Sequence, residues 1–383
     1  MPAILAHNRM TDEVVITGIG MVTPLGFTAA GVLEKIQAGA TAIAPPRQFD
    51  ASPFGCPVCA TIDDFRPQDF IAEAKLIRLM SRDAQLAVAA AHLALQDAGL
   101  GENRCYAPED IGVFGATGLA GLPVREIAPM LKASTDAAGQ FDLTKFGDAG
   151  LRAVSPILSF KILSNMPICF VSICENLQGP SAVYTPWEGH GARAIESGVL
   201  ALLDGDARCV LVGGCDVKTH ELAFLALEQL GLFESWHRTG TGLAPGEGAV
   251  FLVLETAAAA LNRGAKSYAR IADWKFQCQQ GPPAADGLAA VLSGLLTPQV
   301  GAVIAAANSD PALEQAEALA FTQTNLAATL TLTPKKQLGE WFAAAAPLQV
   351  ALAALLAHQL GQAVVAACFG HGTEQAAFRL EPR

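Results

Sequence analysis

The residues of this sequence that could do chemistry are few, and the most conspicuous pair is the C-x-x-C motif Cys56-Pro-Val-Cys59. Such a pair binds zinc when a second ligand pair stands at suitable spacing, and it is redox-active when it opens a helix after a strand. Neither context accompanies Cys56 and Cys59, so we interpret both as apolar strand residues. The nine cysteines are scattered along the chain, which does not indicate a disulfide framework.

Histidines are the next candidates. His92, His220 and His358 fall on helix-like segments without the spacing of metal ligands. His190 and His371 could each be a general base or a hydrogen-bonded interior residue, and a base needs both a substrate and a nucleophile that it can activate. Glu188, two residues before His190, is a poor recipient of such activation. We therefore expect no metal site and no cofactor.

Composition narrows the class of protein. A length of 383 residues fits two domains or one large duplicated fold. The formal net charge of -11 argues against nucleic acid and membrane surfaces as partners, because both are anionic. A hydrophobic content of 51% predicts an extensive apolar interface and therefore an oligomer. The segment 1–13 lacks the pattern of a secretory signal, so we expect a cytoplasmic protein.

The elements that must position these side chains alternate between strand and helix. The segment 122–165 interrupts this alternation and has no strong periodicity, so we expect it to leave the core. We predict strands at 14–17, 111–114, 209–212, 249–254, 301–306 and 363–368, a further strand that begins at Ser267, and helices at 29–38, 81–98, 192–203, 256–263, 284–295, 311–321 and 343–360.

This alternation predicts an α/β layered fold with mainly parallel sheets. The series breaks near 256–267 and then restarts, which indicates two similar halves. We therefore divide the chain into an N-terminal extension, 1–13, an N-terminal half, 14–257, and a C-terminal half, 258–383.

Five segments in order resemble the β-ketoacyl synthase family. Together they imply a duplicated thiolase-like α-β-α-β-α layered fold that dimerises across an edge strand of each N-terminal half. They are the opening strand and loop Val14 to Gly26, the approach to the nucleophile elbow Gly179-Pro-Ser181, the strand start Gly246-Glu-Gly-Ala249, the join Arg263 to Ala269, and the loop Cys368-Phe-Gly-His-Gly-Thr-Glu374.

The resemblance implies a cysteine that carries the acyl chain as a thioester, and two histidines that stabilise the enolate formed from a malonyl unit. Counted from Gly179-Pro-Ser181, the cysteine position falls on Glu188, which cannot carry a thioester. Ala306 follows a strand where the first histidine belongs. In Lys335-Lys-Gln-Leu-Gly-Glu340 the lysine remains, but Glu340 stands in the place of the second histidine. We therefore expect no catalytic residue, and a vestigial site formed by Glu188, Ala306, Lys335 and Glu340.

Two interpretations of the carboxylates stay open. Glu188 and Glu340 could face each other, raise each other's pKa and share a proton as a residual acid–base pair. They could instead plug the old cavity, with Lys335, His190 or backbone N–H groups as partners, because buried charges need partners.

The resemblance also implies a tunnel or gate for an acyl chain. Phe369 and Gly370 fall in the loop that resembles the family's gating segment, and His371 replaces the second aromatic residue of that loop. Trp187 and His190 flank Glu188. We expect these five residues to line the tunnel or its gate, although Trp187 could equally be an ordinary core aromatic.

Three functions follow from these expectations. The first is a non-catalytic, chain-length-factor-like subunit that pairs with a catalytic β-ketoacyl synthase and meets acyl carrier protein indirectly, in polyketide, aryl polyene or fatty acid biosynthesis. The second is an independent acyltransferase, hydrolase or decarboxylase that uses Glu188 or Glu340 as its base. The third is a module that binds an acyl chain without turnover.

Overall fold

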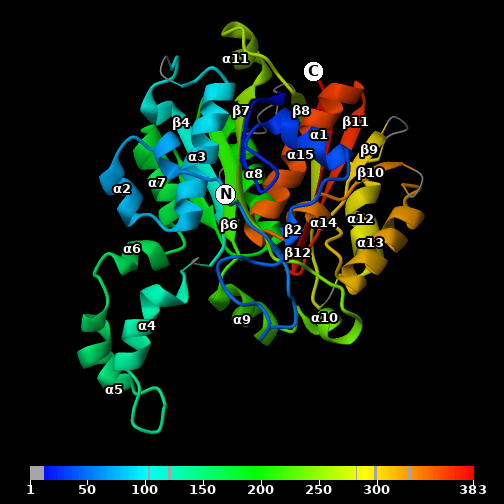
Figure 1. Ribbon diagram of the computed structural model, residues 1–383. Helices are drawn as coiled ribbons and strands as arrows, with labels where there is room; N and C mark the ends of the chain where they lie inside the picture. Colours follow the sequence, from blue (N-terminus) through cyan, green and yellow to red (C-terminus); the bar gives the residue numbers. More distant parts are fainter. Residues whose placement is uncertain (1–12, 102–103, 120–121, 282, 297–299, 327–328) are drawn as a thin grey trace, which may run out of the picture.

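Ten strands form one twisted sheet through the centre of the protein (Figure 1). The computed structural model describes residues 13–101, 104–119, 122–281, 283–296, 300–326 and 329–383. The sheet order is β10-β9-β11-β12-β8-β1-β7-β6-β4-β5. The strands are β1 (Val14–Val22), β4 (Ile111–Thr117), β5 (Ser181–Tyr184), β6 (Cys209–Val217), β7 (Glu247–Thr256), β8 (Ala269–Cys278), β9 (Val300–Ile304), β10 (Leu330–Leu332), β11 (Ala363–Cys368) and β12 (Glu374–Pro382).

The sheet consists of two series of five strands with the same arrangement. In each series the first strand is antiparallel to the second, the second is antiparallel to the third, and the last three are parallel. The series are β1-β7-β6-β4-β5 and β8-β12-β11-β9-β10, and they meet where Val15 and Ile16 of β1 pair with β8. The domain boundaries 14–257 and 258–383 stay a prediction.

The expectation of mainly parallel sheets holds for four of the five strands in each series, but it missed the reversed direction of the fifth. Both β7 and β12 run antiparallel to their two neighbours, so each series is mixed. Strand direction could not be predicted because the strands are buried on both faces, as all residues of β1 and β6 are. The sequence of such a strand is continuously apolar whether its neighbours are parallel or antiparallel. The strand β12 was also missed, because it carries Arg379 and Glu381 among its apolar residues.

Helices complete a thiolase-like arrangement of five layers. The pair α3 (Arg82–Asp97) and α7 (Met166–Glu175) covers the outer face of the first series of strands, and the pair α12 (Ala285–Ser293) and α13 (Pro311–Gln323) covers the second. The middle layer is α8 (Glu188–Leu203) with α15 (Ala345–Leu360). The prediction of an α-β-α-β-α fold is therefore confirmed.

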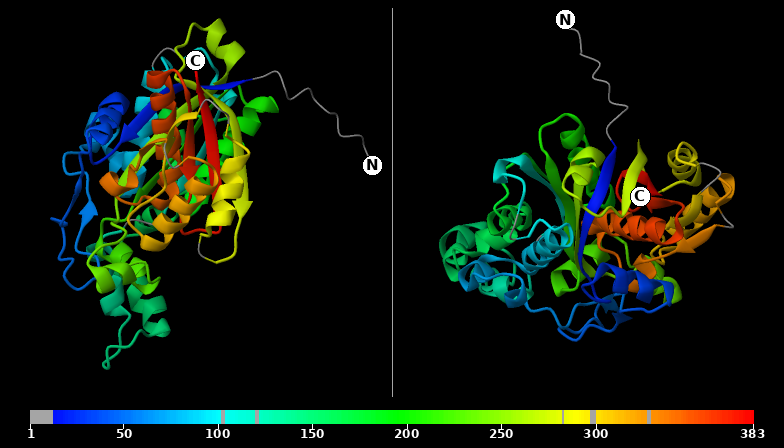
Figure 2. Two further views of the ribbon diagram at one scale, coloured as in Figure 1. Left: turned by 90° about the vertical axis from the view of Figure 1, so that its right-hand side faces the viewer. Right: turned by 90° about the horizontal axis from the view of Figure 1, so that it is seen from above.

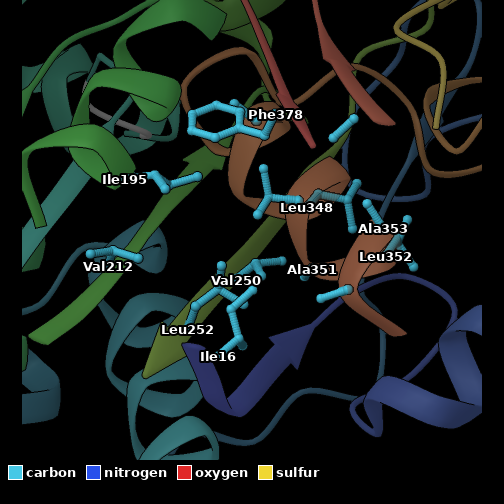
Figure 3. Close-up of a cluster of buried hydrophobic side chains, with 14 of the residues drawn as sticks. Ile16, Ile195, Val212, Val250, Leu252, Leu348, Ala351, Leu352, Ala353 and Phe378 are labelled. Carbon is cyan, nitrogen blue, oxygen red and sulfur yellow. The ribbon is translucent and has the colours of Figure 1, made fainter. Parts of the chain in front are cut away.

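The middle layer is a buried apolar cluster (Figure 3). Leu348 and Leu352 of α15 lie in this cluster together with Ile195 of α8 and Val250 of β7. Gly191 allows α8 to approach α15, because a Cβ there would lie 2.5 Å from the carbonyl oxygen of Ala343. The helical segment Phe342–Leu360 is long and apolar enough to cross a membrane, but most of it is buried inside the protein, as expected of a central core helix.

The segment 122–165 departs from the core as predicted, and it forms an arm at the lower left of Figure 1. Its helices are α4 (Val124–Ala133), α5 (Leu143–Lys145) and α6 (Leu158–Ile162). Several large apolar side chains of the arm are exposed: Leu131, Phe141, Leu143, Leu151, Ile157, Phe160 and Ile162.

The remaining helices connect or flank these layers, and Figure 2 shows them from two further sides. They are α1 (Ala29–Gln37), α2 (Ala74–Leu79), α9 (Glu221–Gln229), α10 (Glu234–Thr239), α11 (Ala257–Asn262) and α14 (Lys335–Leu338). Cys56 and Cys59 lie buried in a cluster of aromatic side chains beside α9, where burial raises the pKa of each thiol to about 12.

Candidate functional site

Glu188 is the first residue of α8 and is completely buried. A carboxylate in the first turn of a helix is favoured by the unpaired N–H groups and by the helix dipole. The loop after β11 closes over it: a Cβ at Gly370 would lie 2.0 Å from the carboxyl carbon of Glu188. Glycine is therefore required at position 370 for the carboxylate to occupy the head of α8.

His371 is the partner of Glu188. Its Nδ1 lies 3.0 Å from Glu188 Oε1, and its backbone N–H donates to the same oxygen at 3.1 Å. Burial alone would raise the pKa of Glu188, but the hydrogen bond and charge of His371 outweigh it, so the pKa of Glu188 is lowered. Burial opposes the positive charge on His371, but the hydrogen bond to Glu188 and the charge of that carboxylate outweigh the effect of burial. The pKa of His371 is therefore raised. The two groups form a buried ion pair.

The expectation that His190 would be a partner of the carboxylates was wrong. Its Nδ1 lies 3.0 Å from the backbone nitrogen of Trp187, whose N–H it accepts, so His190 caps the start of α8. His190 Nδ1 therefore already accepts a hydrogen bond at the start of α8, and His190 is not a partner of Glu188.

Glu340 has a separate set of partners. Lys335 Nζ lies 2.9 Å from Glu340 Oε2, and the side-chain amide of Asn308 donates to the same oxygen at 2.7 Å. Lys335 also donates to the carbonyl oxygen of Phe369 at 3.1 Å. Burial opposes the charge on Lys335, but Glu340 and then Glu188 outweigh it, so its pKa is raised. The predicted pairing of Lys335 with a buried carboxylate is confirmed.

The two carboxylates come together as expected, but they do not share a proton. Ligand atoms of Glu188, Glu340 and His371 lie within 4.8 Å of one another. Each carboxylate already has its own cationic partner, so the pKa of Glu188 is lowered rather than raised. A divalent cation held by these three residues would have to replace the ion pairs that Glu340 makes with Lys335 and Glu188 makes with His371. We therefore assign no metal to the cluster.

Ala306 ends the strand region where the first histidine was expected, and it is fully buried. The backbone N–H groups of Ala306 and Ala307 donate to the two carboxylate oxygens of Glu317 at 2.6 and 3.0 Å. The analysis of the sequence did not single out Glu317. The available signal was its place on α13 among the buried positions Leu313, Ala316 and Ala320, where an acidic side chain needs buried donors.

Glu317 gives a prediction for pH dependence. Burial outweighs the two N–H donors and raises its pKa to about 7, from an ordinary 4.5. A raised carboxyl pKa means that the unfolded state ionises first, so stability falls as pH rises from 4.5 to about 7 and then levels off. In Glu317→Gln this contribution disappears. Chemical denaturation from pH 4.5 to 8 should show a smaller loss of stability in Glu317→Gln than in the unmodified chain, whereas Glu314→Gln on the same helix should follow the unmodified chain. Parallel curves for all three would contradict the assignment.

An apolar cleft of about 140 Å³ adjoins the vestigial site. Its lining is mostly aliphatic and aromatic, and its polar residues are Lys218 and His220. The Lys218 ammonium pairs with the buried carboxylate of Asp216. The lining comprises Leu119, Pro186, Trp187, Lys218, His220, Leu222, Ala223, Ala226, Leu227, Leu230 and Phe342.

Of the five residues predicted for a tunnel or gate, Trp187 lines this cleft. His190, Phe369, Gly370 and His371 are not among its lining residues, and Phe369 is completely buried. Their role in a tunnel or gate stays a prediction. Sequence reasoning missed Phe342 and the α9 side chains, because the cleft brings them to Trp187 only through the tertiary fold.

Comparisons with known proteins agree with this geometry. The profile "Beta-ketoacyl synthase, N-terminal domain" matches residues 11–260. A 3-oxoacyl-[acyl-carrier-protein] synthase 2 of Coxiella burnetii is 28% identical over 334 residues, which cover 82% of this chain and 77% of the relative. The corresponding synthase of a Synechocystis species is 27% identical over 338 residues, covering 82% of this chain and 77% of that protein.

Solved structures share the fold. The ishigamide ketosynthase/chain length factor has a TM-score of 0.80 at 22% identity, covering 97% of this chain and 99% of that chain. A β-ketoacyl synthase from Burkholderia phymatum also has a TM-score of 0.80, at 20% identity, covering 97% of this chain and all of that chain. With the profile match over residues 11–260 and the two layered halves, these similarities show that the chain belongs to the β-ketoacyl synthase family.

Proposed function

We propose that this chain is a non-catalytic subunit of the chain-length-factor kind, which pairs with a catalytic β-ketoacyl synthase and shapes the path of acyl chains bound to acyl carrier protein. One observation carries the proposal: the nucleophile position holds Glu188, buried in an ion pair with His371. A thioester-forming nucleophile must attack and later leave, which a thiolate does and a paired carboxylate does not.

No activated thiol replaces the missing nucleophile near the cluster in the described part of the chain: Cys368, next to Phe369, is fully buried, and burial raises its pKa to about 12. Cys215 lies inside β6, where burial raises its pKa well above the ordinary value, and Cys174 on α7 has its pKa raised to about 11. The first histidine position is Ala306, which has no side-chain donor, and the second is Glu340, which already has Lys335 and Asn308 as partners. The scaffold of a condensing enzyme is kept without its reactive groups.

The surface around β5 supports a partner subunit. This strand is at the end of the sheet and hydrogen-bonds to β4 on one side, so its other edge offers backbone groups for pairing. In the same N-terminal series, Ile173 of α7 is 58% exposed, and Leu119 in the lining of the cleft is 65% exposed. Exposed apolar area of this kind is typical of a protein interface.

Two structures of similar fold are consistent with such an assembly. One is described as a ketosynthase/chain length factor, and another as a type II acyl carrier protein in complex with its ketosynthase. A type II polyketide, aryl polyene or fatty acid pathway and a cytoplasmic location are part of this proposal.

Co-expression tests the pairing. With a cysteine-containing synthase from the same gene cluster, we expect a stable heterodimer in size-exclusion chromatography, whereas the chain alone should self-associate through its exposed apolar surface. An arginine at Val183 in β5 should weaken the heterodimer, and an arginine at exposed Leu261 on α11, far from β5 in the sheet order, should not. A monodisperse monomer with no affinity for any synthase of its cluster would contradict the proposal.

The variant Glu188→Gln separates the proposal from an independent enzyme that uses Glu188 as a base. Gln keeps the volume but removes the charge that pairs with His371, so we expect a loss of about 1–3 kcal/mol in the free energy of unfolding. The heterodimer should still form, and the partner's condensation rate should change only a few-fold.

The control is Glu34→Gln on the exposed face of α1, which should alter neither property. If Glu188→Gln assembled normally but lost turnover by several orders of magnitude, Glu188 would be a base and the independent-enzyme hypothesis would replace ours.

A further inference from the structure

Phe342 is in an unusual position for a large side chain. Its φ of +41° lies in the left-handed region, where a Cβ is unfavourable, and its side chain is 1% exposed. A phenylalanine kept in this conformation must be held by its surroundings, and such strain clusters at functional sites.

The Phe342 ring contacts both the apolar cleft and the buried ion pair. It packs on the ring of Trp187, with centroids 5.7 Å apart, and both residues line the cleft. It also contacts the imidazole of His371, which does not line the cleft, with centroids 5.9 Å apart. Displacement of this one ring would therefore connect the cleft to His371.

His371 has an unused hydrogen-bonding atom. Its Nδ1 is committed to Glu188, whereas its Nε2 is buried and has no hydrogen-bond partner among the described residues. In the imidazolium form, which the neighbouring Glu188 carboxylate favours, both ring nitrogens carry a hydrogen and Nε2 is a donor. A buried donor without an acceptor is costly, so it favours a ligand that brings an oxygen atom.

The charges around His371 define the kind of oxygen. His371 and Lys335 are cationic, and Glu188 and Glu340 are anionic, so the cluster is neutral as a whole. A neutral carbonyl oxygen can accept the Nε2 hydrogen without adding a net charge to the buried cluster, whereas a carboxylate would leave an uncompensated one.

We propose that the apolar cleft and His371 form one non-covalent binding site for acyl thioesters, in which the Phe342 ring moves aside and the thioester carbonyl accepts a hydrogen bond from His371 Nε2. The acyl chain then lies against Trp187, Leu227 and Leu230 in the cleft. The inference deepens the proposed function, because it names the group by which the subunit holds an acyl chain without reacting with it.

Two matched probes test the carbonyl contact on the full-length chain: S-decanoyl-N-acetylcysteamine, and its thioether analogue S-decyl-N-acetylcysteamine, which lacks the carbonyl. Isothermal titration calorimetry should give a Kd for the thioester that is about tenfold lower than that for the thioether, the lower end expected of a hydrogen bond to a charged group. His371→Phe should bring the ratio close to one, and His358→Phe on the exposed end of α15 should leave it unchanged.

Phe342→Gly tests the gate. Glycine adopts a positive φ without strain, and it removes the ring that must move, so both probes should bind more tightly. Because His371→Phe leaves Glu188 unpaired, the double variant Glu188→Gln/His371→Phe is measured beside it and should give the same ratio near one.

The inference is overturned if neither probe binds, if the thioester preference survives in both His371 variants, or if Phe342→Gly weakens binding. Size-exclusion chromatography of the same preparations with the synthase keeps the two proposals apart. A chain that pairs with the synthase but does not prefer the thioester contradicts this inference alone, and a chain that prefers the thioester but never pairs contradicts the proposed function alone.

Discussion

Replacing Lys335 by methionine should lower the free energy of unfolding by about 3–5 kcal/mol, because it leaves the buried carboxylate of Glu340 without its cation. Lys335 is 1% exposed and Glu340 is completely buried, so solvent cannot take over the role of the ammonium group. The loss also removes the hydrogen bond to Phe369, which fixes the loop after β11. Methionine has a similar length, so a cavity contributes little to the expected effect.

The neighbouring Lys336 provides the matched control. It pairs with Glu314, but both side chains are more than one-third exposed. Because exposed pairs contribute about 0–1 kcal/mol, Lys336→Met should be close to the unmodified chain. Urea denaturation of both variants at pH 7 measures the difference, and equal stability of the two variants would show that Lys335 is not the essential cation of the cluster.

The chain alone should neither become acylated nor condense acyl and malonyl thioesters. Glu188 lacks a thiol, and Ala306 removes a donor that would polarise a thioester carbonyl; one such donor is typically worth about a hundred- to a thousandfold in rate. Because the proposed function places Glu188, Ala306 and Glu340 at the positions of the nucleophile and the two histidines, we expect no condensation above the uncatalysed background.

Intact-protein mass spectrometry after incubation with acyl carrier protein thioesters tests this expectation, and the cysteine-containing synthase provides the positive control. In the heterodimer the acyl adduct should appear on the synthase alone. An adduct on Cys169, Cys174 or Cys215 of this chain would contradict the pseudoenzyme interpretation.

Local patterns in the sequence were sufficient for seven of the fifteen α-helices in the described residues, but not for α7 of the outer layer or α9 of the cleft. The helix predicted at 81–98 is α3, Arg82–Asp97. The spacing of its apolar residues indicates a helix, and Gly99 indicates where the helix ends. Strand direction was not predictable, because the buried strands carry no alternation that distinguishes a parallel neighbour from an antiparallel one. The alternation of strands and helices predicted an α/β layered fold, and the family resemblance supplied its five-layer order.

Three members of the site and the pairing of Lys335 with a carboxylate were predictable, but the partner of Glu188 was not. Position in the motifs was enough to single out Glu188, Lys335 and Glu340. The partner of Glu188 is distant in the chain, and the nearer His190 was a plausible alternative until its capping contact with Trp187 was known. Phe342 was missed for a similar reason: its backbone strain and its position between Trp187 and His371 are properties of the tertiary structure.

The central place of α15 also constrains how the protein is made. Its side chains cover α8 and the strands of both series, yet it is synthesised after most of the chain. At ribosomal rates the residues between α8 and α15 take on the order of ten seconds to emerge. Throughout that interval the first half has no native cover for the apolar face of α8. Nascent chains that stall before α15 should therefore be strong clients of chaperones that bind exposed apolar surface.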